Sequence, residues 1–525
     1  MSTGGSNAAL MNAGASTFDY GDEPGAAGYN MLPPLRTDTH SSLAAKDQLH
    51  KTTTALPDRA GRRPQEFRAR SAWNAADAPG WAASAKNALL SSRLNLLLLF
   101  IPCAWVAHFE NVAGHWSYRL TFAFCFLSIT ALNKTIDWCG KQTAPYLGRG
   151  LGDLLVITSP NIVDGILSIV LLCKCELRLL QSLIIGVIVL HLILIPGTAF
   201  LAGGALVWEQ QLHEHNTQLN RSLLAIGVLA IFLPTTFFAA LDRGARSAGP
   251  TGVLQPSGNV VTDDMRTGIL KMSRGLAIIL IVVYVCCRFY LHRPPPQESY
   301  IAESSEGQND HEEKPGYGLR VSSSEMGPGA CAVVLAVALG LTATTTVFLV
   351  ESIDRVMADG HIPEEWFGLV LLPLASFSAD GTVLLLFFAK AMFHHIAKRE
   401  PLAASDFAQA RSIDVSIQFV LFWMPFIVLL GWWTDKPMHL LFDFYELAVV
   451  AGSCMLLNYV TADMKTNWIE GFILIGFYTM IAVSTWYYVG QSELALMLSC
   501  PESIGRGGLV DEGDTALILL GVRLG

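Results

Sequence analysis

Long apolar runs separated by short polar stretches dominate the chain from residue 88 onward. Each run holds about twenty residues, the length that an α-helix needs to cross the hydrocarbon core of a bilayer. The runs cover residues 88–107, 117–133, 151–173, 179–202, 219–241, 270–291, 329–350, 365–389, 413–433, 440–461 and 468–489. The pattern therefore predicts an all-α polytopic membrane protein with about eleven transmembrane helices.

The composition agrees with a chain that is solvated mainly by lipid. Of its 525 residues 52% are apolar and 15% are charged, and the mean hydropathy is +0.41. The formal net charge is −9 and no basic block is present, so nucleic acid is not an expected partner. The ten cysteines lie mostly inside apolar runs, without zinc-site spacing or the density of a disulfide scaffold, and are interpreted as packing residues.

The polar stretches divide the chain into five parts. Residues 1–86 predict a disordered cytosolic tail, and residues 87–290 hold a leading helix and a first group of spans. Residues 291–328 form an acidic linker, which is followed by a second group of spans over residues 329–489 and by a C-terminal tail, residues 490–525. Lys and Arg are in excess on the side of the membrane that carries the N-terminus, which the positive-inside rule places in the cytosol.

Two aspartates interrupt the apolar runs. Asp164 follows Ser159-Pro160-Asn161 in the third run, and Asp380 follows Ser376-Phe377-Ser378 in the eighth. A charged side chain at that depth costs about 3 kcal/mol or more and is a functional residue by default. Matched interruptions by Pro or Gly in two halves mark the ion site of transporters built from repeats. We therefore predict that Asp164 and Asp380 share one metal cation in the middle of the membrane.

Neutral oxygen donors accompany both acids. Calcium takes about six to eight oxygens at about 2.3–2.6 Å from carboxylates, amides and carbonyls. The neutral ligands predicted from the sequence are Asn161, Ser378, Ser416 and Gln418. A proton-transferring group or a third acid is expected at His191 or Asp414. Simpler roles stay open, because the amides and His191 can instead form hydrogen bonds between helices, and the serines can serve as small packing residues.

In its short motifs the chain resembles the vacuolar cation/proton exchangers of the calcium/cation antiporter superfamily. The resemblance covers residues 88–489. It rests on Leu89-Leu90-Ser91-Ser92-Arg93-Leu94-Asn95, Ile269-Leu270-Lys271-Met272-Ser273-Arg274-Gly275, Phe367-Gly368-Leu369-Val370-Leu371-Leu372-Pro373, Ser416-Ile417-Gln418 and the stretch from Asn458 to Gly471. It implies a leading helix, two inverted five-helix repeats and an acidic cytosolic loop between them. It further implies export of cytosolic calcium into the vacuole against protons, through a Gly-Asn-x-x-Glu motif in each repeat.

The sequence departs from that motif in both halves. Pro160-Asn161-Ile162-Val163-Asp164 keeps the asparagine, but its acid is one methylene shorter than glutamate. Ser376-Phe377-Ser378-Ala379-Asp380-Gly381 has lost the asparagine and also carries aspartate. His191 stands where the family has asparagine, and Asp414-Val415 where it has Gly-Ser. Both buried charges persist although several neutral ligands do not, which favours retained exchange with an altered ion affinity or ion choice.

The sequence therefore predicts a secondary active transporter that exchanges a divalent cation, with Ca²⁺ as the first choice, for protons across a vacuolar or other internal membrane. No enzymatic activity and no resident cofactor are expected. The partners are the cation, protons and the lipid bilayer, and a monomer and a homo-oligomer both remain open.

Two alternatives to transport remain. One is a non-transporting regulator that derives from an exchanger. The other is an intramembrane aspartyl protease, because Gly150-Leu151-Gly152-Asp153 spells the second signature of such enzymes. That signature should follow the first catalytic aspartate, whereas here it precedes the other acids, so the order along the chain disfavours a protease.

Overall fold

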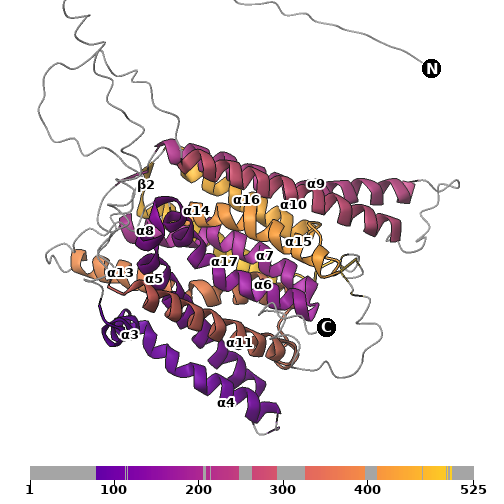
Figure 1. Cartoon of the computed structure of the whole chain (residues 1–525). Helices are drawn as coiled ribbons and strands as arrows, with labels where there is room; N and C mark the ends of the chain where they lie inside the picture. Colours follow the sequence, from indigo (N-terminus) through magenta and orange to yellow (C-terminus); the bar gives the residue numbers. More distant parts are fainter. Residues whose placement is uncertain are drawn as a thin grey trace, which may run out of the picture. The chain divides into compact units, whose positions relative to one another are not determined.

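The computed structural model describes residues 79–204, 209–247, 263–292, 325–396 and 411–491 apart from residues 113, 115, 213 and 464, together with residues 494, 497, 498 and 500. Within these ranges the chain is almost entirely helical (Figure 1), which confirms the fold class predicted from the apolar runs. Most of the expected N-terminal tail, the acidic linker and the C-terminal tail lie outside the described residues.

The first half of the chain runs from α3 to α10. Its elements are α3 (Trp81–Leu90), η1 (Arg93–Leu99), α4 (Phe100–Val112), α5 (Tyr118–Thr158), η2 (Ser159–Asn161), α6 (Ile162–Lys174), α7 (Leu177–Val189), η3 (Leu190–Leu194), α8 (Ile195–Gly204), β1 (Gln210–Gln211), α9 (Glu214–Ser247) and α10 (Asp263–His292). Helix α3 begins at Trp81, inside the last few residues assigned to the tail.

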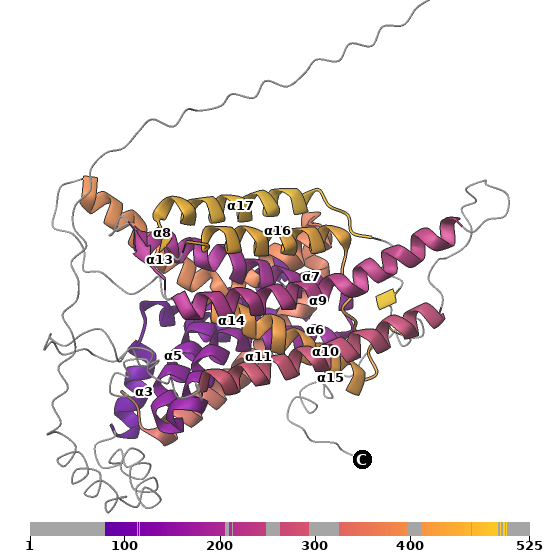
Figure 2. The ribbon, with the colours of Figure 1, turned by 90° about the horizontal axis from the view of Figure 1, so that it is seen from above.

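The second half runs from α11 to α17. Its elements are α11 (Pro328–Gly360), α12 (Glu364–Trp366), η4 (Phe367–Leu371), α13 (Leu372–Ile396), α14 (Arg411–Gln418), η5 (Phe419–Trp423), α15 (Met424–Trp433), α16 (Phe444–Val460), β2 (Lys465–Thr466) and α17 (Trp468–Trp486). Figure 2 shows α16 and α17 side by side, with α9 next to α16 and α10 next to α9.

Every apolar run predicted from the sequence is helical. In the described part of the chain eight segments are long and apolar enough to cross a membrane, or nine if the bent pair Glu364–Ser378 and Asp380–His394 is one span. The apolar helix Phe444–Val460 is shorter than the others. The second run forms the first part of α5, where Arg119 and Lys134 lower the hydropathy. The expected eleven crossings thus all correspond to helices, two of which fall below the length or hydropathy of a typical span.

Helix α5 consists of two helices that meet at Gly148. This residue has φ +78° and ψ 176°, a backbone conformation that is essentially confined to glycine. The chain changes direction there, and the part after the break continues through η2 into α6 as the span Gly150–Lys174. The second and third predicted runs are therefore separate crossings, and the break at Gly148 divides them.

Three π-helical turns, η3, η4 and η5, each end two residues before a proline. These prolines are Pro196, Pro373 and Pro425. A proline lacks the backbone N–H, and its ring clashes with the carbonyl four residues earlier. Local π geometry accommodates both defects inside a membrane helix. The turns η3 and η5 lie in the fourth and ninth runs, so matching breaks occur in the two halves and support the expected repeat organisation.

The span Leu177–Gly204 lies at the centre of the helix packing. Within an 18-residue apolar window of this span 89% of the residues are buried, against 28% in the corresponding window of Asp264–Tyr290. Glycine allows the closest contact of this central span. A Cβ atom at Gly186 would lie 2.3 Å from the carbonyl oxygen of Leu369, so the backbones of α7 and η4 touch directly.

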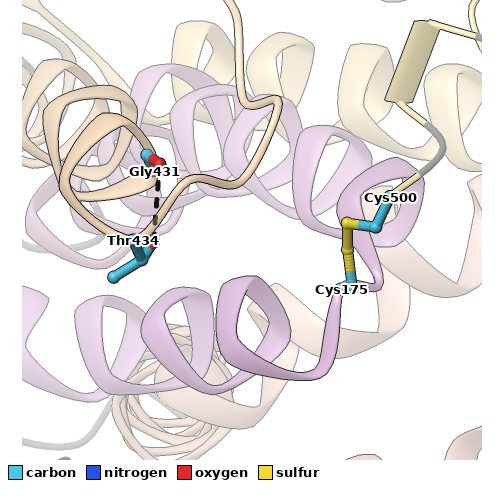
Figure 3. Close-up of a disulfide and its surroundings, with 4 residues drawn as sticks. All are labelled: Cys175, Gly431, Thr434 and Cys500. Carbon is cyan, nitrogen blue, oxygen red and sulfur yellow. Dashed lines mark hydrogen bonds between the residues drawn. A yellow bond between two sulfur atoms is a disulfide. The ribbon is translucent and has the colours of Figure 1, made fainter. Parts of the chain in front are cut away.

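Two connections tie distant segments together. Strand β1 pairs with β2 in antiparallel register, with Gln210 opposite Thr466. A disulfide joins Cys175, at the turn between α6 and α7, to Cys500 in the C-terminal tail (Figure 3). The interpretation of all cysteines as packing residues is therefore wrong for this pair, which the sequence could not match across a separation of 325 residues. The free cysteines that are buried as expected are Cys125, Cys139, Cys331 and Cys454.

Candidate cation site

Asp164 lies in the first turn of α6, directly after the 3₁₀ turn that Pro160 initiates. Its residue surface is 1% exposed, and neither carboxylate oxygen has a hydrogen-bond partner among the described residues. The hydroxyl of Ser376 lies beside the carboxylate but donates to the carbonyl oxygen of Pro373 at 2.9 Å. Asp164 is therefore a buried acid that faces α13 with unused lone pairs.

The residue after Asp164 sets how closely α6 approaches the second half of the chain. A Cβ atom at Gly165 would lie 2.4 Å from the ring of Trp423 in η5. Only glycine fits against this ring without a shift of one helix. Farther along α6, the Ser168 hydroxyl donates to the carbonyl oxygen of Asp164 at 2.7 Å, which satisfies the backbone but not the carboxylate.

Asn161 and Gln418 connect the two halves through their amides. The Asn161 side-chain nitrogen donates to Gln418 Oε1 and to the carbonyl oxygen of Val415, both at 3.0 Å. The Gln418 side-chain nitrogen donates to Thr158 Oγ1 at 2.7 Å and to the Tyr284 hydroxyl at 3.0 Å. The role of interhelical hydrogen bonding, which the sequence left open for both residues, is therefore realised. Asn161 Oδ1 is buried without a partner in the described part of the chain.

The second acid belongs to a broken helix. The two parts of this span, Glu364–Ser378 and Asp380–His394, meet at an angle of 69°. Side chains of α5 hold the break: Asn133 donates to the carbonyl oxygen of Ser376, and Thr130 Oγ1 lies 2.9 Å from Ser378 Oγ. Ser378 is thus half-buried and bonded to α5 at the bend.

Asp380 forms an ion pair with Lys134 of α5. The side chains of Asp380 and Lys134 are 44% and 27% exposed, so this pair is more accessible than Asp164. Helices α6 and α13 are in contact, which places the two predicted acids on neighbouring elements. That both acids hold one ion stays a prediction, and in this structure the ammonium of Lys134 occupies Asp380.

The remaining predicted residues lie between helices. The Ser416 hydroxyl donates to the carbonyl oxygen of His191 at 3.0 Å. His191 Nδ1 lies 2.8 Å from the carbonyl oxygen of Val187, and its ring stacks on Phe419. Asp414 Oδ1 accepts from Asn220 Nδ2 at 2.8 Å. Ser416 and His191 therefore join the two π-helical spans to each other, and Asp414 bonds to α9.

Four buried oxygens form the chemically distinctive part of the site. Asn133 Oδ1, Asn161 Oδ1 and both oxygens of Asp164 lack donors among the described residues. Unpaired buried oxygens are costly unless a cation or proton satisfies them. No group of three or more His, Cys, Asp or Glu side chains in the described ranges could hold a metal ion. A cation here would therefore depend on amide and carbonyl oxygens around one carboxylate.

Sequence analysis missed five residues of this arrangement. They are Thr130, Asn133, Lys134, Tyr284 and Ser376. The first three lie within little more than one helical turn of α5, and their i, i+3 and i, i+4 spacing places them on one face. Polar residues repeated at that spacing beside an apolar run were the available signal.

Comparisons with known proteins show similarity to calcium transporters and cation/proton exchangers. The family model described as sodium/calcium exchanger protein matches residues 331–487. The vacuolar calcium ion transporter of Cryptococcus neoformans is 29% identical over 496 residues, which cover 81% of this chain and 78% of that protein. Vacuolar cation/proton exchanger 5 of Arabidopsis thaliana is 25% identical and is covered over 82% of its length. The solved structure of native YfkE has a TM-score of 0.53 at 19% identity and covers 76% of this chain and all of its own.

The fold and the breaks define a class first: a polytopic helical membrane protein whose two halves each place an acid next to an interrupted helix. Within that class, the chain is similar in sequence to the vacuolar calcium ion transporter of Cryptococcus neoformans and to vacuolar cation/proton exchanger 5 of Arabidopsis thaliana. The likeness to YfkE extends over the membrane part and confirms the arrangement of helices.

Proposed function

We propose that this chain exchanges a divalent cation, with Ca²⁺ as the first choice, for protons across a vacuolar or other internal membrane by alternating access. The relatives are named as vacuolar calcium transporters and cation/proton exchangers, which supports both the reaction and the compartment. The interrupted helices in both halves support a mechanism in which one half moves against the other around a fixed site.

One observation carries the proposal: the carboxylate of Asp164 is fully buried, without a donor in the described part of the chain, beside the interrupted α13. A buried charge in that state requires a cation or a proton as its partner. Because both compete for the same oxygens, binding of one releases the other. If only the loaded site crosses between the two faces of the membrane, this competition produces exchange.

The disulfide supports the orientation expected from the charge pattern. With a cytosolic N-terminus and eleven crossings, Cys175 follows the third crossing and Cys500 follows the last, so both lie on the side opposite the cytosol. Disulfides persist in compartments outside the reducing cytosol. The Cys175–Cys500 bond is therefore consistent with a luminal α6–α7 turn and a luminal C-terminal tail.

Nothing in the described part of the chain favours an intramembrane aspartyl protease or a non-transporting regulator. For a protease, Asp153 and Asp164 are separated by eleven residues of helix, about 16 Å along the axis, too far to share one water. For a non-transporting regulator, a chain freed from ion binding would gain stability by losing the buried Asp164 charge.

Uptake into acid-loaded membrane vesicles tests the proposal. Labelled calcium or manganese is added outside vesicles that contain the full chain or its Asp164→Asn variant. The expected result is proton-driven uptake that falls at least about tenfold in Asp164→Asn, because the amide cannot neutralise a cation. Asp359→Asn, which removes an exposed partner of Arg119, is the matched control and leaves uptake unchanged. Absence of uptake in the parent, or full uptake in Asp164→Asn, contradicts the proposal.

A further inference from the structure

Among the described residues, one lysine or arginine forms an ion pair with one of the two predicted acids. This residue is Lys134, which pairs with Asp380. Its position is fixed by its neighbours on α5. Asn133 donates to the carbonyl oxygen of Ser376, and Thr130 donates to the carbonyl oxygen of Ala375 at 3.0 Å. Three neighbouring side chains of α5 therefore contact α13 around its bend. This alignment places the ammonium of Lys134 against Asp380.

Asp380 is the ion-pair partner of Lys134, although a second acid lies near the same lysine. Asp137 lies on the same helix near Lys134, but it forms its own ion pair with Lys141, four residues farther along. The charges of the Lys134–Asp380 pair cancel, and Asp164 then supplies one negative charge in place of the two that a pair of free acids would offer.

We propose that Lys134 is a resident counter-ion of the transport site, which a divalent cation must displace from Asp380 and which thereby lowers the affinity for divalent ions. The inference rests on the proposed function and adds a specificity-determining residue to it. An ion that reaches Asp380 must first separate this ion pair. This step weakens divalent binding more than monovalent binding, because the repulsion from the ammonium scales with the charge of the incoming ion.

The chemistry of lysine suits this role. Its charge is a compact ammonium on a flexible four-carbon stem, so it can leave a carboxylate without a change in the helix that carries it. Both side chains are partly exposed, so the ammonium has space to move away from the carboxylate. A purely structural bridge between α5 and α13 is the competing explanation, and it predicts the opposite effect of removing the charge.

Binding of labelled Ca²⁺ to the purified full chain in detergent tests the inference, together with the calcium dependence of uptake in vesicles. In Lys134→Gln the Kd for Ca²⁺ should fall at least about tenfold, because the competing charge is gone. In Lys134→Arg, which keeps the charge, the Kd should not fall below that of the parent. In Lys141→Gln, which removes a lysine from the same helix, it should stay within about twofold of the parent. An unchanged or raised Kd in Lys134→Gln overturns the inference.

A double variant keeps the test decisive if Lys134→Gln folds poorly. Asp380→Asn leaves Lys134 without its ion-pair partner, so its charge opposes an incoming cation and calcium binding should weaken strongly. Lys134→Gln/Asp380→Asn removes that unpaired charge and should bind calcium more tightly than Asp380→Asn alone. If the double variant binds no better than Asp380→Asn, the pair is only a structural bridge and the inference fails.

The two proposals fail in distinguishable ways. Calcium uptake by the parent with an unchanged affinity in Lys134→Gln overturns the counter-ion role alone. Absence of calcium binding and uptake in both the parent and Lys134→Gln overturns the exchange function itself. Calcium binding that becomes measurable only in Lys134→Gln supports the counter-ion role directly.

Discussion

An unpaired oxygen distinguishes Asn161 from Gln418, the amide to which it bonds. Its nitrogen is engaged with α14, whereas its Oδ1 is buried without a donor among the described residues. Gln418, in contrast, accepts from Asn161 through Oε1 and donates through its nitrogen. One amide thus retains a free oxygen for a cation, and the other orients it.

Asn161→Ala should therefore weaken calcium binding by about tenfold, because a ligand oxygen and two interhelical hydrogen bonds are lost together. Tyr284→Phe removes a hydrogen bond to Gln418 Nε2 and does not touch Asn161. It should lower the thermal midpoint but leave the Kd for calcium within about twofold. Equal losses of calcium affinity in the two variants would show that Asn161 acts through packing alone.

The sequence predicted the buried acids but not their partners. Asp164 and Asp380 were recognisable because a charge inside an apolar run is costly wherever the run lies. The pairing of Asp380 with Lys134 was not, since it joins residues 246 positions apart and depends on the rotation of α5 about its own axis. Gln418 was expected at the site, whereas its bonds to Thr158 and Tyr284 required the packing of three helices.

Among the elements, prolines and glycines account for the breaks and for the closest crossing. Apolar runs of the length of a membrane span predicted each helix, because the bilayer fixes that length. Prolines visible in the sequence account for the π-helical turns. The exact position of each turn depends on how the helix re-forms its backbone hydrogen bonds around the proline. Short or polar helices such as α16 and the start of α5 show that a crossing can depend on neighbouring helices rather than on its own hydropathy.

Gly186→Ala should lower the thermal midpoint by about 5 °C, because the new methyl group would overlap the backbone of Leu369 and separate α7 from η4. The measurement is thermal unfolding of the purified chain in detergent. Gly275→Ala is the matched control, since a Cβ atom there meets no described atom within 4 Å. It should leave the midpoint unchanged or raise it slightly, through the better helix propensity of alanine. A stable Gly186→Ala variant would contradict the close crossing.

At the scale of the whole molecule, a group of charges gathers at the turn that carries the disulfide. Burial, followed by the negative charges of Asp354 and Glu364, raises the pKa of Glu176 from 4.5 to about 7. Between these values the folded chain holds a proton that the unfolded chain releases. Stability should therefore fall as the pH rises from about 4.5 to about 7. If this turn faces an acidic lumen, the chain is most stable in the compartment where it is proposed to act.

Thermal unfolding at pH 5 and at pH 7.5 tests this dependence. The parent should unfold at a higher temperature at pH 5, and Glu176→Gln should lose part of the difference, because the amide does not titrate. Glu325→Gln alters an exposed residue at the other end of α11 and serves as the control. A pH dependence that is identical in the parent and in Glu176→Gln would remove Glu176 from this account.

Coupled flux through the purified chain tests the central claim most directly. Proteoliposomes with an acidic interior and a trapped pH dye receive labelled calcium outside, and calcium entry and internal alkalinisation are followed together. The account predicts that both occur in a constant ratio in the parent and in Asp359→Asn, and that both disappear in a folded Asp164→Asn variant. Calcium entry without alkalinisation, or coupled fluxes that persist in Asp164→Asn, would contradict it.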